Sequence, residues 1–255
     1  MTINVGVLGA SGRMGSQVCE AIGNDEGTIL MAAIDENQIG DYVGVSDIQI
    51  SGDISDLKGA DVVVDFTTAS SARNNLPVIA EMGIHAVVGT TGFTEADVKS
   101  IESSFVNSNC LLASNFAISA VLMMRFSEIA APYFNNVEII EYHHNSKIDA
   151  PSGTALSTAE RIGASSNDWD QDPTDRHVLE GARGGTTKDG IPIHSVRMEG
   201  MVAHQDVIFG AEGQTLTIRQ DSYHRSSFMP GVLIAIKKIE DYPGVTLGLD
   251  KFLNL

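Results

Sequence analysis

The amino-acid sequence predicts an α/β protein with a parallel sheet in its N-terminal part and a second, α+β domain that contains a mixed sheet. Short apolar runs alternate with helical segments over residues 3–113, which is typical of parallel strands covered by helices on both faces. Three consecutive segments of strand character follow over residues 193–220, and consecutive strands favour antiparallel or mixed pairing. A length of 255 residues is sufficient for two domains.

The N-terminal part begins with a strand, a helix and a second strand, at 3–8, 13–22 and 29–34, which together form a βαβ unit. Further strands are predicted at 62–66, 86–89 and 110–113, and further helices at 72–82 and 94–105. Pro77 falls inside the helix predicted at 72–82. Because proline lacks an N–H group, we expect it near the start of that helix or at a kink.

The pattern changes after residue 117. The sequence predicts a long apolar helix at 118–134, a strand at 137–143, a surface loop at 164–190, strands at 193–198, 206–209 and 214–220, and a helix at 228–239. Gly200 and Gly213 lie in the gaps between the last three strands, which predicts antiparallel hairpins. The predicted domains are therefore 1–116 plus 228–255, and 117–227 inserted between them.

Charge and composition exclude several classes of partner. The formal net charge is −17, whereas nucleic acids and anionic membranes are bound through basic residues, so neither is expected as a partner. No apolar run is long enough to span a bilayer, and the N-terminus lacks the basic start of a signal peptide. Cys19 and Cys110 are expected to be core thiols of a reducing, cytoplasmic compartment. No metal is expected, because spacings such as CxxC and HExxH do not occur.

A glycine-rich turn follows the first predicted strand directly. The segment GASGRMG, residues 9–15, allows a tight turn and a close approach of the backbone to a pyrophosphate at the start of the next helix. Asp35 ends the second strand twenty residues after Gly15, where a carboxylate binds the ribose in dinucleotide-binding proteins. Together these features predict a Rossmann domain. Taken singly, the turn also occurs without a ligand, and Asp35 is also explained as a solvated strand end.

Other residues bear on the choice and position of the cofactor. Asp35 and Glu36 would repel a 2′-phosphate and favour NADH, whereas Arg13 in the turn is placed to reach that phosphate, to contact the pyrophosphate or to remain solvated. The segments GTTGF at 89–93 and ASNF at 113–116 each follow a strand, so we expect them at the carboxyl edge of the sheet, where ligands bind. The alternative for GTTGF is a plain turn.

The segment EYHHNSKIDAPSGTA, residues 141–155, carries the candidate chemistry. If the preceding strand stays extended, His143 and Lys147 share one face and form a pair that can handle protons, while His144 faces away. The sequence PSGT then opens a helix, whose first N–H groups suit a carboxylate, although Ser152 or Thr154 is equally explained as a helix cap. A metal role is disfavoured, because adjacent strand residues point apart.

With these motifs the sequence closely resembles the 4-hydroxy-tetrahydrodipicolinate reductase family of the lysine and diaminopimelate pathway. The resemblance extends over GASGRMG, FTTASS, VVGTTGF, ASNFAISA, EYHHNSKIDAPSGTA, the region from GARGG to HSVRMEG and the ending GVTLGLDKFLNL. It implies reduction of a cyclic, imine-type dicarboxylate with loss of water, with NADH and/or NADPH as cofactor and no metal, in a homotetramer joined through the second domain.

The resemblance also implies roles for individual residues. His143 is similar to the family's proton donor and acceptor, Lys147 to its proton donor, and His144, Gly153 and Thr154 to its substrate-binding residues. The cofactor positions implied are Gly9, Ala10, Ser11, Gly12, Arg13, Met14, Asp35, Gly89, Thr90, Thr91, Ala113, Ser114, Asn115 and Phe116. A substrate role for His144 requires the strand to end or bulge there.

Two other functions share much of this pattern. A semialdehyde or sugar dehydrogenase of the same build would need a different catalytic segment in place of HHNSKIDAPSGT. A nicotinamide-sensing regulatory protein would be expected to lack the proton donors, whereas His143 and Lys147 are both present.

Overall fold

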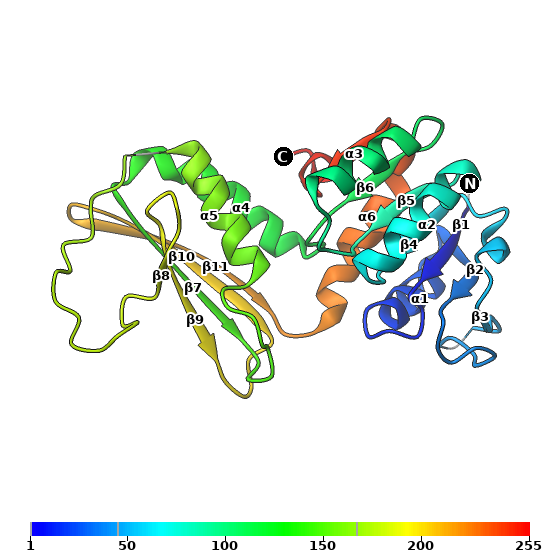
Figure 1. Ribbon diagram of the computed structural model, residues 1–255, viewed down its shortest axis with the longest axis horizontal. Helices are drawn as coiled ribbons and strands as arrows, with labels where there is room; N and C mark the ends of the chain where they lie inside the picture. Colours follow the sequence, from blue (N-terminus) through cyan, green and yellow to red (C-terminus); the bar gives the residue numbers. More distant parts are fainter. Residues whose placement is uncertain (1, 45, 167) are drawn as a thin grey trace. The chain divides into compact units, whose positions relative to one another are not determined.

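The computed structural model describes residues 2–44, 46–166 and 168–255. It consists of two compact units, each of which is described by itself. The first unit comprises Met1–Ala117 and Arg225–Leu255, and the second comprises Ile118–His224. Figure 1 labels the elements of both units along the chain.

The first unit contains a seven-stranded sheet in the order β12-β6-β5-β4-β1-β2-β3, and every pairing in it is parallel. The strands are β1 (Ile3–Leu8), β2 (Thr28–Ile34), β3 (Ile50–Ser51), β4 (Val62–Asp65), β5 (His85–Val88), β6 (Cys110–Leu112) and β12 (Val245–Leu247). The predicted parallel sheet is therefore confirmed. The sequence reasoning missed β3 and β12, because strands of two and three residues are too short to show a periodic pattern.

Among the described residues of this unit, the α-helices are α1 (Gly15–Gly23), α2 (Ala69–Glu81), α3 (Glu95–Ser104) and α6 (Met229–Lys238). Helix α2 begins earlier than predicted, because the Thr68 hydroxyl caps it by accepting a hydrogen bond from the N–H of Ser71. Pro77 lies in the second half of α2, so the predicted position near the helix start is wrong. Short 3-10 helices occupy Ile54–Leu57, Arg225–Phe228, Ile239–Asp241 and Asp250–Leu253.

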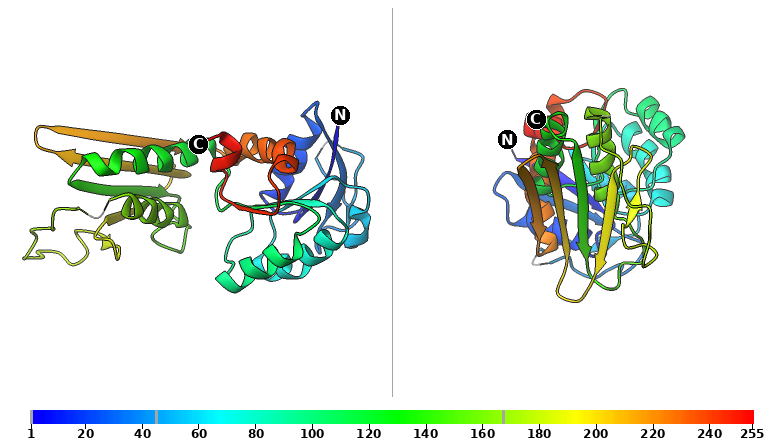
Figure 2. Two further views of the ribbon diagram at one scale, coloured as in Figure 1. Left: turned by 90° about the horizontal axis from the view of Figure 1, so that it is seen from above. Right: turned by 90° about the vertical axis from the view of Figure 1, so that its left-hand side faces the viewer.

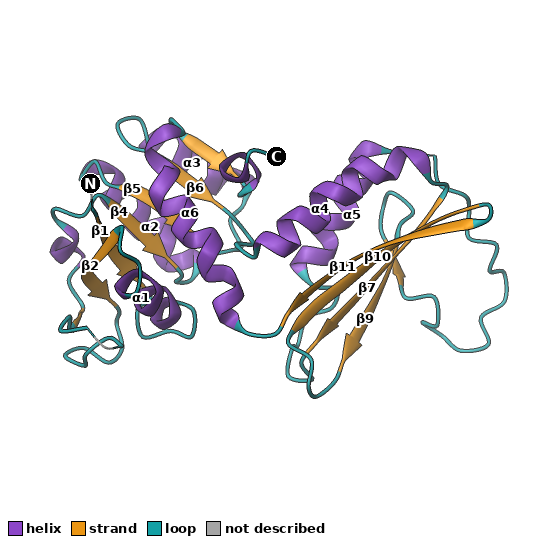
Figure 3. Ribbon diagram, turned by 180° about the vertical axis from the view of Figure 1, so that it is seen from behind, coloured by secondary structure: helices purple, strands orange, loops and turns teal. Residues whose placement is uncertain are grey.

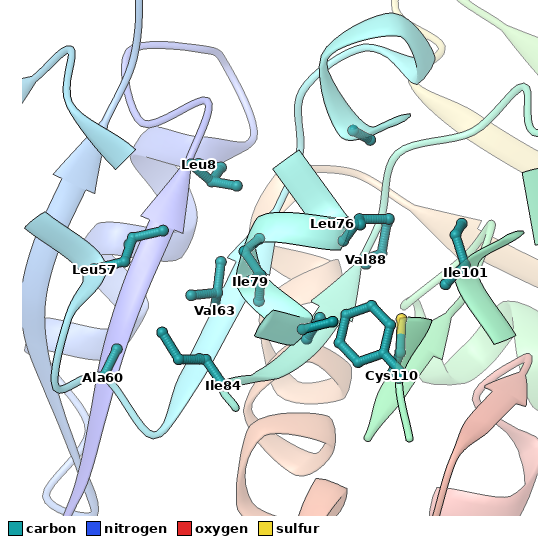
Figure 4. Close-up of a cluster of buried hydrophobic side chains, with 14 of the residues drawn as sticks. Leu8, Leu57, Ala60, Val63, Leu76, Ile79, Ile84, Val88, Ile101 and Cys110 are labelled. Carbon is teal, nitrogen blue, oxygen red and sulfur yellow. The ribbon is translucent and has the colours of Figure 1, made fainter. Parts of the chain in front are cut away.

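A buried apolar cluster holds the sheet of the first unit to its helices. Leu8 and Val63 on the strands belong to one cluster with Leu76 and Ile79 of α2, and Figure 4 shows Val63 beside Ile79 within it. Cys19 and Cys110 are buried free thiols, as predicted. Burial of apolar surface contributes about 25 cal/mol per Å², so this cluster fixes the strand ends that carry the candidate cofactor residues.

The second unit contains a five-stranded mixed sheet in the order β11-β10-β7-β9-β8, which confirms the predicted mixed sheet. Its elements are α4 (Ile118–Ala130), a 3-10 helix (Ala131–Tyr133), β7 (Asn136–His143), α5 (Gly153–Ser165), β8 (Gly185–Thr186), β9 (Pro192–Arg197), β10 (Ala203–Ala211) and β11 (Gln214–Ser222). Figure 3 shows β11, β10, β7 and β9 side by side, and Figure 2 shows the same sheet from two other directions.

Three details of the second unit differ from the prediction. Strands β9 and β10 do not form a hairpin around Gly200, because β7 lies between them, parallel to β9 and antiparallel to β10. The helix predicted at 118–134 ends at Ala130 and is followed by the 3-10 turn Ala131–Tyr133, which contains Pro132. The segment 164–190 is not all loop, since it contains the end of α5 and the strand β8. The β10–β11 hairpin at Gly213 is confirmed.

Within the described part of the chain, no helix combines the length and the apolar character that crossing a membrane requires.

Candidate functional site

The glycine-rich turn between β1 and α1 has a geometry that only glycine satisfies at two positions. Gly9 has φ +78°, in the left-handed region that glycine adopts without strain. A Cβ atom on Gly15 would lie 1.9 Å from the carbonyl oxygen of Gly9, so the first turn of α1 packs directly against the strand end. The turn closes with a hydrogen bond of 3.0 Å from the Gly12 N–H to the Gly9 carbonyl. The start of α1 is thus presented at the carboxyl edge of the sheet.

A pocket of about 610 Å³ lies beside this turn. It brings together four of the predicted cofactor residues, namely Gly9, Ser11, Gly12 and Asp35. Glu36, which was predicted to influence the choice of cofactor, also lines it. Residues that sequence reasoning did not assign complete the lining: Leu8, Ile34, Asn37, Gly52, Asp53, Ile54, Phe66, Thr67, Thr68, Ser71 and Asn75. The segment FTTASS, which follows β4 as GASGRMG follows β1, was the available signal for four of them, Phe66, Thr67, Thr68 and Ser71.

Asp35 is fixed in place rather than freely solvated. One carboxylate oxygen accepts a hydrogen bond of 3.0 Å from the N–H of Ser11, and the other accepts one of 2.9 Å from the N–H of Asn37. Partial burial raises the pKa of Asp35, but the hydrogen bonds from Asn37 and Ser11 outweigh it and leave the pKa below its ordinary value. An ionised acceptor therefore stands at the end of β2. Arg13 is exposed and does not line the pocket.

Asp65, at the end of β4, connects two neighbouring loops. One of its oxygens accepts hydrogen bonds of 2.7 Å from the hydroxyls of Thr67 and Thr90 and one of 2.9 Å from the Thr67 N–H. Its side chain is fully buried, and burial outweighs these bonds and raises the pKa of Asp65. The predicted residue Thr90 is thereby tied to Thr67, which lines the pocket. A buried carboxylate in this role was not predicted.

Phe66 connects the pocket to the remaining predicted cofactor segments. A Cβ atom on Gly89 would lie 2.1 Å from the Phe66 ring, so glycine is needed for the ring to pack there. The Phe116 ring is buried with its centroid 5.8 Å from that of Phe66. The predicted segments at 89–91 and 113–116 therefore follow β5 and β6 at the same sheet edge, although their residues do not line the pocket itself.

The second predicted site lies where β7 ends. The strand stops at His143, and the N–H of Lys147 donates to the carbonyl of His144 across a turn. The inference that the strand ends near His144 is confirmed, but the proposed strand face shared by His143 and Lys147 is wrong, because Lys147 follows the strand.

The side chains of this turn are held by local polar contacts. The Lys147 ammonium lies 2.7 Å from both carboxylate oxygens of Asp149, and a ring nitrogen of His144 lies 2.8 Å from the hydroxyl of Ser146. Helix α5 then begins at Gly153, with the Ser152 hydroxyl accepting from the N–H of Ala155 at 3.1 Å. Ser152 is therefore the helix cap, and the first turn with Gly153 and Thr154 presents the positive end of the helix dipole.

Glu141 is the centre of this site, and sequence reasoning did not assign it a role. Its side chain is fully buried, and its oxygens lie 2.5 Å from the Nδ1 of His143 and 2.8 and 2.7 Å from the two terminal nitrogens of Arg197. The Ser152 N–H also donates to it at 3.2 Å. The sequence could have indicated the contact between Glu141 and His143 through their spacing, because residues two apart on a strand share a face. Arg197 gave no such signal, since it reaches Glu141 through the parallel pairing of β9 with β7.

These contacts predict how the stability of the folded protein changes in acid. Burial raises the pKa of Glu141, but the bonds from His143 and Arg197 prevail and lower it from 4.5 to about 2. A lowered folded-state pKa contributes stability that is fully present above pH 4.5 and is lost as the pH falls toward 2. Glu141→Gln should be less stable than the parent at neutral pH, and the difference should shrink in acid. Thermal unfolding of both proteins over this range measures it; a difference independent of pH would contradict the assignment.

Comparison with known proteins agrees with this arrangement over the whole chain. The family description "Dihydrodipicolinate reductase, N-terminus" matches residues 3–116, and "Dihydrodipicolinate reductase, C-terminus" matches residues 119–253. The chain belongs to the dihydrodipicolinate reductase family. The resemblance inferred from the sequence motifs is thereby confirmed.

Individual members of this family match the chain along its length. The 4-hydroxy-tetrahydrodipicolinate reductase of Corynebacterium urealyticum is 49% identical, with 99% of each chain covered, and that of Corynebacterium aurimucosum is 47% identical, with 100% of each covered. A solved structure, the dipicolinate-bound dihydrodipicolinate reductase from Paenisporosarcina sp. TG-14, has a TM-score of 0.89 and 39% identity, covering 98% of this chain and 99% of that chain.

Proposed function

We propose that this chain reduces 4-hydroxy-tetrahydrodipicolinate to tetrahydrodipicolinate with NADH or NADPH, with loss of water, in lysine and diaminopimelate biosynthesis. The observation that carries the proposal is family membership over both units, together with His143 at the end of β7 and Lys147 in the turn that follows it. One hydride and one proton are added to the substrate, and one water leaves. The homologue crystallised with dipicolinate, a cyclic dicarboxylate, supports this class of substrate.

The residues of the first unit fit a dinucleotide. Any side chain on Gly15 would collide with the backbone of Gly9, so this turn keeps its N–H groups accessible to a pyrophosphate. Asp35 is an ionised acceptor suited to ribose hydroxyls, and Ser11 and Gly12 line the same pocket. When bound, the nicotinamide supplies the hydride. Thr90 and Phe116, held by Asp65 and Phe66, are proposed to bind the cofactor at the neighbouring strand ends.

The residues of the second unit are proposed to bind the substrate and move its proton. Because Nδ1 of His143 faces Glu141, Nε2 is the ring nitrogen that exchanges a proton. Lys147 carries a positive charge that stabilises negative charge on the substrate and donates a proton to it. Gly153 and Thr154, in the first turn of α5, bind a substrate carboxylate, and His144 contributes a further contact.

An activity assay separates this proposal from the two other functions considered. The purified protein is mixed with freshly generated 4-hydroxy-tetrahydrodipicolinate, and cofactor oxidation is followed by absorbance. We expect substrate-dependent oxidation of NADH or NADPH and none with semialdehyde or sugar substrates. Cofactor binding without oxidation would instead identify a regulatory protein.

We expect NADH to be used at least as well as NADPH. The ionised Asp35, with Glu36 beside it in the pocket, would repel a 2′-phosphate, and exposed Arg13 does not line that pocket. Arg13 is nevertheless in the turn, so some activity with NADPH is expected. Steady-state kinetics with both cofactors measures the preference. A kcat/KM for NADPH more than about tenfold above that for NADH, or 1.4 kcal/mol, would contradict this assignment.

The proposed assembly is a homotetramer in the cytoplasm. Ile140, Val196 and Ile208 are half-buried in the single chain and lie on the sheet face opposite Ile139 and Val207, so this face offers apolar surface to a second copy. Sedimentation velocity measures the assembly. The buried free thiols Cys19 and Cys110 support a reducing compartment.

A further inference from the structure

Glu141 and Arg197 connect the two residues to which proton handling is assigned. Glu141 contacts Nδ1 of His143 directly. Arg197 binds both oxygens of Glu141 and also donates a hydrogen bond of 2.8 Å to the backbone carbonyl of Asp149, whose side chain holds the Lys147 ammonium. One continuous set of contacts thus runs from the end of β7, through β9, to the turn that carries Lys147.

The contact with Glu141 fixes which nitrogen of His143 carries a hydrogen. Arg197, the N–H of Ser152 and the side chain of Ser195 already donate to this carboxylate, whose pKa is lowered to about 2. An ionised carboxylate only accepts hydrogen bonds, so Nδ1 must be the donor. The neutral ring then has its lone pair on Nε2, and the orientation of the ring is fixed by a group that does not itself take up the proton.

Two charged side chains next to His143 act in opposite directions on its protonation. The negative charge of Glu141 favours the imidazolium form, whereas Arg197, the register partner of His143 on β9, disfavours it. The register partner on β10, Ala203, is uncharged, and the Lys147 charge in the following turn is paired with Asp149. From the residue that caps α5, the backbone N–H of Ser152 faces Glu141, and this group carries no net charge.

We propose that Glu141 and Arg197 are a positioning pair for the reductase, in which Glu141 orients His143 and the balance of the two charges sets the pH at which His143 takes up its proton. The proposal rests on the proposed function for its catalytic meaning, but the charge balance is a property of the unliganded protein. Neither residue touches the substrate in this assignment. Both act through His143 and through the turn that carries Lys147.

The test compares two variants that remove opposite charges. Glu141→Gln removes the negative charge, and Arg197→Met removes the positive one. NMR titration of the His143 ring from about pH 5 to pH 8, with the signal assigned through His143→Gln, measures the midpoint directly. We expect the midpoint to fall in Glu141→Gln and to rise in Arg197→Met, each by about one pH unit. The pH profile of kcat should move in the same directions, with NADH affinity unchanged.

Glu138→Gln is the matched control. Glu138 is also on β7 and also binds an arginine and a histidine, Arg183 and His194, but it lies on the opposite sheet face. Its replacement should leave the His143 titration unchanged. If Glu141→Gln does not fold, Glu141→Asp retains the charge but withdraws it by one methylene, and it should lower the midpoint less.

The outcomes separate this inference from the proposed function. Midpoints that move in the same direction in the two charge variants, or do not move, would show that the pair only supports the fold, and the inference would be wrong. An unmodified protein that fails to reduce the substrate would refute the proposed function, whereas opposite shifts in the NMR titration would still support the charge balance around His143.

Discussion

Replacing Lys147 with Met is expected to lower kcat by ~10²- to 10⁴-fold, the range typical of a positioned acid or base. Methionine keeps the length of the side chain but removes the ammonium group, and with it the charge that stabilises the reduced substrate and the proton it donates. Asp149, which holds the ammonium at 2.7 Å, would lose its partner but is exposed enough to be solvated. The cofactor residues belong to the first unit, so NADH affinity, measured by fluorescence, should not change.

Three further variants make this expectation specific. Lys188→Met makes the same replacement at an exposed position of the second unit and should leave kcat unchanged. Thr154→Ala should act mainly through KM for the substrate, because Thr154 is assigned to binding. His143→Gln should lower kcat, as Lys147→Met does. Near-normal kcat in Lys147→Met with intact NADH binding would show that the ammonium has no part in the chemistry.

The parallel sheet could be predicted because its signal is local and repeated. Each of the longer strands is a continuous apolar run that ends in a glycine or polar segment, and the helices between them have regular spacing. The pairing of β7 with β9 could not be predicted in this way. Neighbours in the sequence favoured a β9–β10 hairpin, but β7 lies between these strands and pairs with β9 along one edge and with β10 along the other.

The residues of the candidate sites also divide into those that a local sequence pattern indicates and those that it does not. The glycine turn, Asp35, His143 and the start of α5 stand at element ends, where a local sequence pattern marks them. Asp65 is the last residue of β4 and Glu141 lies inside β7, and no local pattern marks either carboxylate as functional until its burial and its partners are known. Arg197 depends on the register of two strands that are far apart in the sequence. Local patterns therefore indicate the groups that contact ligands better than the groups that hold them in place.

The second large effect is expected from Gly15→Ala, which should weaken NADH binding ~10- to 100-fold, the equivalent of losing one charge-assisted hydrogen bond of ~1.5–3 kcal/mol. The added Cβ would lie 1.9 Å from the carbonyl oxygen of Gly9 and 3.0 Å from the Cα of Ala10. Both atoms belong to the backbone, so no side-chain rotation relieves the collision. The start of α1 must therefore move away from β1, and the N–H groups assigned to the pyrophosphate move with it.

Gly23→Ala provides a matched control at the other end of the same helix. A Cβ atom on Gly23 meets no atom within 4 Å, and Gly23 is not among the glycines with positive φ. This variant should bind NADH as the parent protein does and gain up to ~0.5–1 kcal/mol of stability, because alanine loses less backbone entropy than glycine on folding. Titration with NADH, followed by fluorescence, measures the affinity of both variants. Thermal unfolding confirms that both variants fold. If folded Gly15→Ala bound NADH as tightly as Gly23→Ala, the pyrophosphate would have to bind elsewhere than at the start of α1.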